Sequence, residues 1–170
     1  MRKSREDGFI EFAGGLTGHL FRSACLLTSG DTHLAEDLVQ ESLGRMYLKW
    51  ERISRADSPA AYAQTVLVRT FLTYRRRRSS TERPVADLPD VPLVTGPDPL
   101  LRLALLQALA QLPPKDRAVV VLRYWEDRSI EETAEAMQIS SSAVRTRASR
   151  ALARLRTLLG GSLAELVVAG

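Results

Sequence analysis

The chain has 170 residues, 45% of them hydrophobic and 26% charged, which is enough for one domain of ordinary size or two small ones. Its net charge of +4 and its isoelectric point near 9.6 favour a polyanionic partner. No apolar run is long enough to cross a bilayer, no apolar core follows the basic N-terminus as in a signal peptide, and the single cysteine excludes an internal disulfide, so we expect a soluble, cytoplasmic protein.

Residues 1–78 are expected to form a first helical domain, because their apolar side chains recur at helical spacing from Phe9 onward. The first helix ends at Ser29-Gly30-Asp31, and Asp31 can cap the second. A polar loop over residues 51–57 follows the second helix. The next helix has a strong start signal in Ser58-Pro59, a capping serine before a proline at the first helical position.

The second helix carries a polar strip along one side. The strip combines acidic and amide groups and would suit the arginines of a partner protein; it consists of Glu36, Asp37, Gln40 and Glu41. The alternative is a solvated helix face, which the periodicity alone favours.

The distribution of proline predicts two domains. Five of the eight prolines lie between Pro84 and Pro99, and residues 79–98 have no helical period, so we expect a flexible linker there. A second domain over residues 99–160 opens with the cap-plus-proline pair Asp98-Pro99. Its first helix would end at Pro113-Pro114 and present on one face Leu101, Leu105, Leu109 and Leu112.

A further helix is expected over residues 115–126, and the apolar residues 161–170 form a tail. The tail either docks on the last helix or stays loose. The sequence also leaves open whether the two domains pack together when the protein is free.

Residues 129–156 have the pattern of a helix-turn-helix. Ser129 can cap a short helix, and Glu132 stands three residues later, the spacing of a capping box. Residues 138–140 are the expected turn, and a second helix begins at Ser141. That helix buries an apolar stripe of Val144, Ala148, Ala151, Leu155 and Leu158.

The opposite face of this helix favours DNA binding. Arg145 and Arg150 flank a cluster of small side chains made of Ser142, Thr146, Ser149 and Ala153. A small polar face edged by arginines can enter the major groove, where bulky residues would hold the helix away and acids would repel phosphate. The alternative is the solvated face of an ordinary amphipathic helix.

Two motifs in this order resemble the sigma-70 family of bacterial RNA polymerase sigma factors. Ala35–Glu41, between Gly30-Asp31 and a later Trp50, resembles conserved region 2. Leu112–Tyr124 and Arg147–Arg156 resemble the start and end of region 4. The resemblance covers about Phe9 to Leu159 and leaves no room for regions 1.1 and 3. This pattern is typical of the extracytoplasmic-function (ECF, group 4) class, and its details resemble the actinobacterial sigma-E-like type.

The resemblance implies an all-α protein with two small helical domains, sigma region 2 over residues 1–78 and sigma region 4 over residues 99–160. Such a protein binds core RNA polymerase, recognises the −35 and −10 promoter elements and directs transcription initiation. It does no covalent chemistry and needs no cofactor or metal. Implied partners are the β′ clamp helices and β flap of core polymerase, promoter DNA and an anti-sigma factor.

The family pattern also assigns roles to individual positions. Core polymerase would bind Glu36, Asp37, Gln40 and Glu41. The −10 element would meet Arg55, Asp57, Tyr62, Arg69, Thr73, Arg75, Arg76 and Arg77, with a flipped base held in the loop. The −35 element would be read by Ser141, Ser142, Arg145, Thr146 and Arg150, with phosphate contacts from Arg147 and Arg154.

Two departures from the family pattern lie in the helix-turn-helix. Gln138 stands where many relatives place glycine in the turn, so the turn either differs or carries about 1 kcal/mol of strain. Ser142-Ala143 stands where relatives often have Gly-Thr, so promoter preference cannot be inferred from those positions. Rival interpretations are a stand-alone helix-turn-helix regulator and an inactive sigma-like scaffold that binds an anti-sigma factor.

The remaining candidate residues favour structural roles. Cys25 lies in an apolar helix and is expected in the core rather than in a redox sensor. His19 and His33 have no metal-ligand spacing to it. Trp50 and Trp125 are expected in the core rather than as base-stacking platforms.

Overall fold

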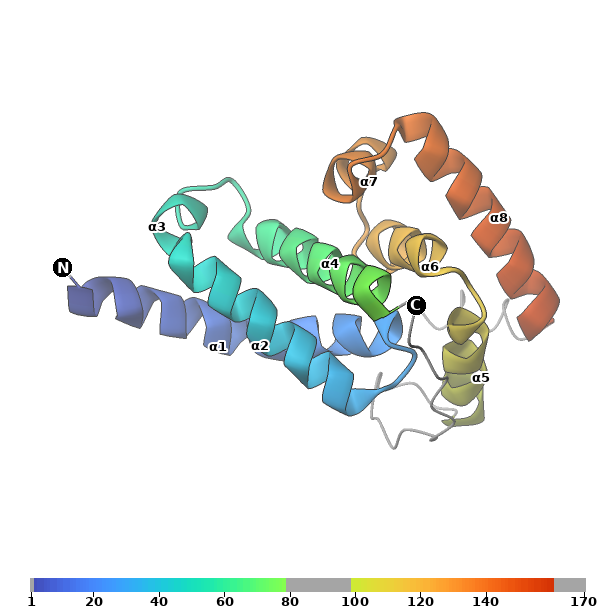
Figure 1. Ribbon diagram of the computed structural model, residues 1–170, viewed down its shortest axis with the longest axis horizontal. Coiled ribbons are helices and arrows are strands. Elements are labelled where there is room, and N and C mark those ends of the chain that lie inside the picture. The colour runs from blue at the N-terminus through green and yellow to red at the C-terminus, as the bar shows by residue number, and fades with distance from the viewer. Residues whose placement is uncertain (1, 79–98, 161–170) are drawn as a thin grey trace.

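The computed structural model describes residues 2–78 and 99–160, and all regular secondary structure in those ranges is helical (Figure 1). The first range forms α1 (Arg2–Leu27), α2 (Thr32–Leu48), α3 (Trp50–Ile53) and α4 (Pro59–Arg78). The second range forms α5 (Pro99–Ala110), α6 (Pro114–Val120), the π-helical turn η1 (Val121–Trp125), α7 (Ile130–Met137) and α8 (Ser141–Leu159). The all-α prediction is confirmed. The expected linker with Asp98, and the expected tail, lie outside the described residues.

The helix starts follow from local capping, as the sequence predicts. Asp31 Oδ1 accepts a hydrogen bond from the Leu34 amide (3.1 Å), and α2 begins next to it. Ser58 Oγ accepts from the Ala61 amide (3.1 Å) at the start of α4. Ser129 and Glu132 form a full capping box at α7.

Tertiary contacts change two of the predicted elements in the first half of the chain. The first helix begins at Arg2 instead of Phe9. The loop expected over residues 51–57 is helical in its first part, since Trp50 and Ile53 form part of α3 and are both buried. The Trp50 ring lies 4.8 Å from that of Phe12 on α1, so packing on α1 draws this segment into a helical turn.

The second half also departs from the prediction. The helix expected over residues 115–126 is interrupted, because α6 gives way to the π-helical η1, where the Glu126 amide donates to Val121 O (2.9 Å). In α5, Leu106 and Leu109 are buried while Leu101 and Leu105 are only partly so. In α8, Leu159 replaces the predicted Leu158 in the buried stripe.

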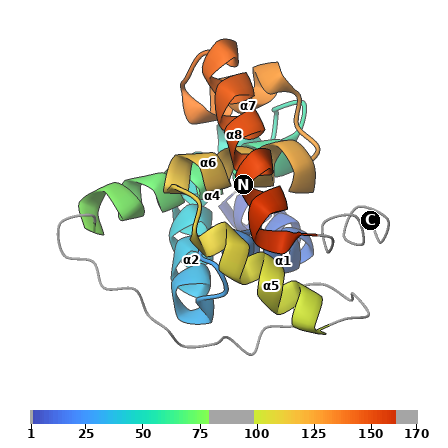
Figure 2. The same cartoon turned by 90° about the vertical axis from the view of Figure 1, so that its right-hand side faces the viewer.

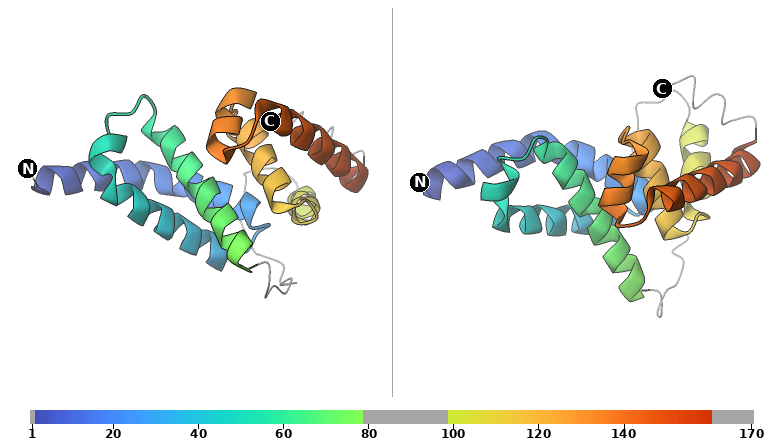
Figure 3. Two further views of the ribbon diagram at one scale, coloured as in Figure 1. Left: turned by 45° about the horizontal axis from the view of Figure 1, so that its top comes forward. Right: turned by 90° about the horizontal axis from the view of Figure 1, so that it is seen from above.

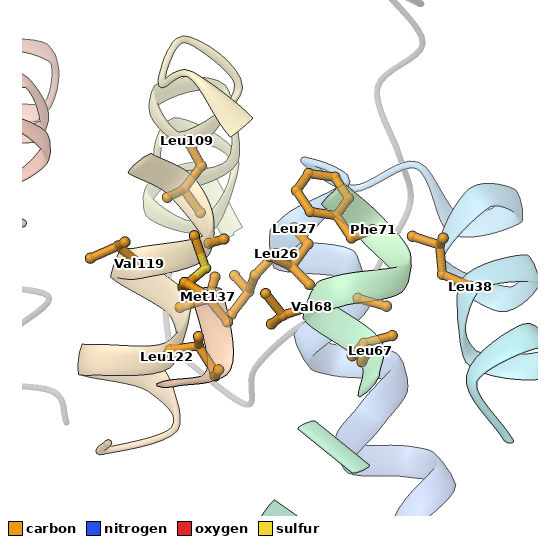
Figure 4. Close-up of a cluster of buried hydrophobic side chains, with 14 of the residues drawn as sticks. Leu26, Leu27, Leu38, Leu67, Val68, Phe71, Leu109, Val119, Leu122 and Met137 are labelled. Atoms are coloured by element: carbon orange, nitrogen blue, oxygen red, sulfur yellow. The ribbon is translucent and has the colours of Figure 1, made fainter. Parts of the chain in front are cut away.

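The two halves of the chain pack against each other, which answers a question that the sequence leaves open. In both views of Figure 3 α7 lies beside α4, and Figure 2 shows α1 and α2 behind α5 and α8. A single buried apolar cluster joins the halves (Figure 4). The first half contributes Leu26, Leu27 and Val68, and the second contributes Leu109, Val119, Leu122 and Met137.

Candidate nucleic-acid interface

The second helix of the helix-turn-helix, α8, presents the face that the sequence predicts. Ser140 Oγ accepts a hydrogen bond from the Ala143 amide (3.0 Å) and fixes the helix start. Val144, Ala148, Ala151 and Leu155 are buried against α6 and α7. The opposite side is exposed and consists of Ser142, Thr146, Ser149 and Ala153. A small, polar surface therefore faces solvent along the length of the helix.

The arginines of α8 fall into two groups. Arg145 is exposed and has no hydrogen-bond or ion-pair partner among the described residues. Arg147 and Arg150 both bind Asp116 of α6: Arg147 Nη1 donates to Oδ1 at 2.7 Å, and Arg150 donates from Nη2 to Oδ1 at 2.9 Å and from Nε to Oδ2 at 3.0 Å. Arg154 Nη2 donates to Gln111 Oε1 at 3.4 Å. The predicted −35 residues thus differ in how firmly they are held.

Asp116 is a carboxylate that the sequence analysis overlooks. Its side chain is only 1% exposed. Burial opposes its ionisation, but the hydrogen bonds and charges of Arg150 and Arg147 outweigh that effect and hold its pKa below the ordinary value. The sequence shows only that α8 carries arginines and no acid, so any carboxylate bound to them lies on another segment.

A basic groove of about 300 Å³ runs along one flank of α8. Its walls include three arginines, namely Arg123, Arg145 and Arg156, and the half-exposed Tyr124 of η1. The Arg123 guanidinium lies 5.5 Å from the centroid of this tyrosine ring. Positive charge therefore extends from the predicted reading face onto η1.

The turn between α7 and α8 has the geometry of a glycine-containing turn without the glycine. Gln138 adopts φ 57° and ψ 44°, the left-handed conformation that closes α7. The Ile139 amide donates to Ala134 O (3.1 Å) across it. Of the two outcomes that the sequence allows, the structure has the strained one, at a cost of about 1 kcal/mol.

The residues predicted to meet the −10 element occupy the segment after α3 and the helix α4. Arg55 and Asp57 are exposed in the loop, and Arg76 and Arg77 are exposed at the end of α4. The partly buried positions are Tyr62, Thr73 and Arg75. The structure therefore presents some of these side chains to solvent and leaves others half covered.

Arg69 of α4 is bound to the other half of the chain. Its Nε donates to Ala136 O (2.9 Å) and its Nη2 to Glu135 O (3.1 Å), both in the last turn of α7. In the reverse direction, Arg128 Nη2 donates to Ala61 O (2.5 Å) and to Gln64 Oε1 (3.0 Å) on α4. Two arginines thus join α4 to the helix-turn-helix.

A buried polar cluster forms a further contact between the halves. His19 Nε2 lies 2.8 Å from Glu126 Oε2, and the Ser23 hydroxyl donates to Glu126 Oε1 at 2.5 Å. The Trp125 indole donates to Ser23 Oγ (2.9 Å), and its ring stacks on His19 at 5.9 Å. Trp125 is therefore partly buried and packs against the core instead of lying inside it, and His19 binds a carboxylate of the second half.

The acidic strip of α2 lies on the surface. Glu36, Asp37, Gln40 and Glu41 are all exposed, and Arg45 Nη2 donates to Glu41 Oε1 at 2.7 Å. The strip continues two helical turns further to Leu48, which is 78% exposed. The spacing of Leu48 from Asp37 and Glu41 places it on the same side of α2, so its position can be read from the sequence.

Cys25 is fully buried, and burial, followed by the charges of Glu36 and Asp31, raises its pKa to about 12.

Among the described residues, no group of three or more His, Cys, Asp or Glu side chains is arranged to hold a metal ion. No helix in the described ranges is long and apolar enough to span a membrane.

The two halves match the family models of Sigma-70 region 2, over residues 16–81, and Sigma-70 region 4, over residues 102–155. Together with the relatives below, these matches show that the chain belongs to the ECF group of the sigma-70 family. It therefore binds core RNA polymerase, recognises −35 and −10 promoter elements and directs transcription initiation, as the resemblance implied.

Among characterised relatives, the chain is 39% identical over 149 residues to the RNA polymerase sigma-E factor of Streptomyces coelicolor, covering 87% of this chain and 84% of that one. It is 33% identical over 146 residues to the ECF RNA polymerase sigma factor SigL of Mycobacterium tuberculosis, covering 82% of each. A solved structure of the sigma factor RpoE of Bartonella quintana with the anti-sigma factor NepR has the same fold, with a TM-score of 0.73, 22% identity and coverage of 91% of this chain and 98% of that one.

Proposed function

We propose that this sigma factor reads the −35 element with the exposed face of α8, contacts the −10 element with α4 and the preceding loop, and binds core polymerase with the strip on α2. The α8 face carries the proposal. Its exposed Ser142, Thr146 and Ser149 are small enough for the helix to enter the major groove, and Arg145 beside them has no partner within residues 2–78 and 99–160. Arg150 would reach a base from the other edge of this face, and Arg147 and Arg154 would lie toward the phosphates.

Recognition of the −10 element would use the exposed loop and the arginine-rich end of α4. Arg55 and Asp57 would contact a base displaced from the duplex, while Arg76 and Arg77 would hold phosphates. Arg69 has the same assignment, but here it is bound to α7. Separation of the two halves on polymerase binding would free its Nε and Nη2 donors for DNA.

The polymerase-binding strip would combine charge with one apolar anchor. Asp37 and Glu41 would pair with basic residues of the clamp helices, and Leu48 would lie in an apolar depression at the end of the strip. Leu48 is 78% exposed on the side of the acidic strip, so it is available to a partner that binds the strip.

The protein would act by binding alone, in the cytoplasm, without a cofactor. The solved relative is bound to an anti-sigma factor, and this supports a partner of the same class for this chain. Such a partner would bind the two halves while they are packed against each other.

Transcription from a genomic template tests the proposal directly. The purified protein is mixed with core RNA polymerase, and the 5′ ends of the transcripts are sequenced. We expect discrete starts that share one −35 and −10 pair, and a loss of −35 dependence when Arg145 is replaced. Polymerase binding without starts would instead indicate an inactive scaffold. Failure to bind polymerase, with tight DNA binding by the protein alone, would indicate a stand-alone regulator.

A further inference from the structure

We propose that Asp116 is a positioning residue for −35 recognition, a buried carboxylate that fixes the guanidinium groups of Arg147 and Arg150 beside the DNA-facing side of α8. The inference rests on the proposed function of α8 and adds a residue on a different helix to it. Asp116 itself would not touch DNA, because its side chain is 1% exposed.

The Asp116 carboxylate binds the guanidinium groups of Arg147 and Arg150 at the same time, and we call these three residues the Asp116 clamp. Oδ1 of Asp116 accepts from both arginines, at 2.7 Å and 2.9 Å, and Oδ2 accepts from Arg150 Nε at 3.0 Å. The pair with Arg150 is bidentate, which fixes the plane of that guanidinium as well as its position. Both carboxylate oxygens are thereby satisfied inside the protein.

The two arginines keep donors for a ligand. Their side chains remain 27% and 58% exposed for Arg147 and Arg150, and a guanidinium has more N–H groups than these bonds use. Both line a groove of about 320 Å³ at the N-terminal half of α8, together with Ser140, Ser142, Ala143 and Thr146. The clamped guanidinium groups therefore border the same small side chains that would face the bases.

The net charge of the cluster formed by Asp116, Arg147 and Arg150 favours DNA binding. One buried carboxylate faces two guanidinium groups, so the cluster keeps a net positive charge, and the acid lies behind the arginines on the protein side. Arginine side chains lose rotamer freedom when they bind a base edge or a phosphate. Asp116 imposes that order before DNA arrives, so less freedom remains to be lost on binding.

Two competing explanations predict different results for Asp116→Asn. If the carboxylate only lowered the positive potential of α8, its removal would strengthen DNA binding at every sequence. If it only held α6 against α8, its removal would weaken use of all promoters alike. A positioning role predicts a selective loss of −35 base discrimination, in spite of the added positive charge.

The test uses complete holoenzyme and promoters with single base-pair substitutions. Transcript yield is measured for the mapped promoter, for substitutions across the −35 element, and for substitutions across the −10 element. We expect Asp116→Asn to lower discrimination about tenfold at one or two −35 base pairs and to leave −10 discrimination unchanged. Gln111→Ala is the matched control, because Gln111 is exposed and binds another α8 arginine, Arg154.

A double-variant comparison connects the effect to the arginine. Adding Asp116→Asn to Arg150→Ala should cause no further loss at the base pairs that depend on Arg150. Additive losses, equal losses at both promoter elements, or unchanged −35 discrimination would each overturn the inference. If circular dichroism shows that Asp116→Asn does not fold, Arg150→Lys replaces it: this variant keeps the charge but not the bidentate fork, and unchanged discrimination in it would also overturn the inference.

Failure of the inference can be told apart from failure of the proposed function. Arg145 lies outside the clamp, so Arg145→Ala tests α8 as the reading helix by itself. If Arg145→Ala and Arg150→Ala reduce −35 discrimination and Asp116→Asn does not, only the positioning role is wrong. If neither arginine variant changes −35 discrimination, α8 does not read the element and the proposed function fails.

Discussion

The Arg69 guanidinium donates from Nε to the backbone carbonyl of Ala136, 2.9 Å away, so a side chain of the first half closes the last turn of α7 in the second. The C-terminal end of a helix carries carbonyl groups without helical hydrogen-bond partners and a partial negative charge. A guanidinium donates to those carbonyls and offsets that charge. The same arginine is a predicted −10 contact, and in this arrangement its Nε and one Nη2 donor are directed at α7. The packing of the halves therefore competes with the proposed recognition of the −10 element for the donors of this residue.

Removing the two arginines between the halves should open the molecule. Arg69→Ala combined with Arg128→Ala deletes the hydrogen bonds from α4 to the last turn of α7 and from the segment between η1 and α7 to α4, each worth about 1.5–3 kcal/mol for a charged donor. We expect a larger radius of gyration in small-angle X-ray scattering than for the unaltered chain. Arg55→Ala is the control, since Arg55 is exposed in the loop before α4. An unchanged radius would mean that the apolar cluster alone holds the halves together.

Gln138→Gly should stabilise the protein. Glutamine at φ 57° places its Cβ near a carbonyl oxygen, and glycine removes that strain, although it also gains freedom in the unfolded chain. The relief of about 1 kcal/mol of strain is partly offset by that freedom, so we expect a net gain of up to about 0.5 kcal/mol in the free energy of unfolding, measured with urea. Gln138→Ala retains the Cβ and should change stability little. A loss of stability in the glycine variant would show that the turn is not strained.

Capping residues are the part of the fold that the sequence predicts best, and the reason is locality. Asp31, Ser58 and Ser129 each accept from an amide three residues later, so the whole interaction lies within a few neighbouring residues. The helical turn at Trp50 depends instead on Phe12, far away in the sequence. No helical period marks such a contact.

In the candidate site, too, features set by local periodicity can be predicted from the sequence, and features set by tertiary contacts cannot. The exposed face of α8 follows from its period, because the buried stripe fixes which side remains outside. The clamp at Asp116 could not be assigned from the sequence, since the carboxylate and its two arginines lie on different helices, 31 and 34 residues apart. The pairing of Arg69 with α7 joins residues 67 positions apart and depends on how the halves pack.

Cys25 should resist thiol reagents in the folded protein. Burial raises its pKa to about 12, so almost no thiolate exists at neutral pH, and the sulfur is also inaccessible. At pH 8 we expect modification by a chromogenic disulfide only as fast as the protein unfolds, with the rate rising in urea. Cys25→Ala gives the background signal. Rapid modification without denaturant would instead support the redox-sensing alternative.

The same shift predicts a loss of stability at alkaline pH. The pKa in the fold is raised above its ordinary value of 9.0, so the folded state holds the proton more tightly than the unfolded state. The contribution is complete below pH 9 and is lost as the pH rises toward 12. Comparing urea unfolding of Cys25→Ala with the unaltered chain across this window should show a weaker pH dependence in the variant.

Arg145→Ala should weaken promoter use through the −35 element. The side chain is exposed and unpaired among the described residues, so its removal leaves no buried charge and should not disturb the fold. We expect a loss of roughly 1–3 kcal/mol in discrimination at the base pair it contacts. Holoenzyme transcription from promoters substituted at single −35 positions measures this. A uniform loss across all sequences would make Arg145 a phosphate contact.

Charge reversal on α2 should prevent holoenzyme assembly. Asp37→Lys with Glu41→Lys places two positive charges where the proposed partner surface is basic, and both side chains are exposed, so helix α2 should still form. We expect native circular dichroism and no co-elution with core polymerase in size-exclusion chromatography. Leu48→Ala should weaken assembly by about 1–2 kcal/mol, because it removes only the apolar anchor. Glu11→Lys is the control, because Glu11 is an exposed acid on α1, away from the strip. Assembly by the charge-reversed variant would move the polymerase interface to another face of the first half.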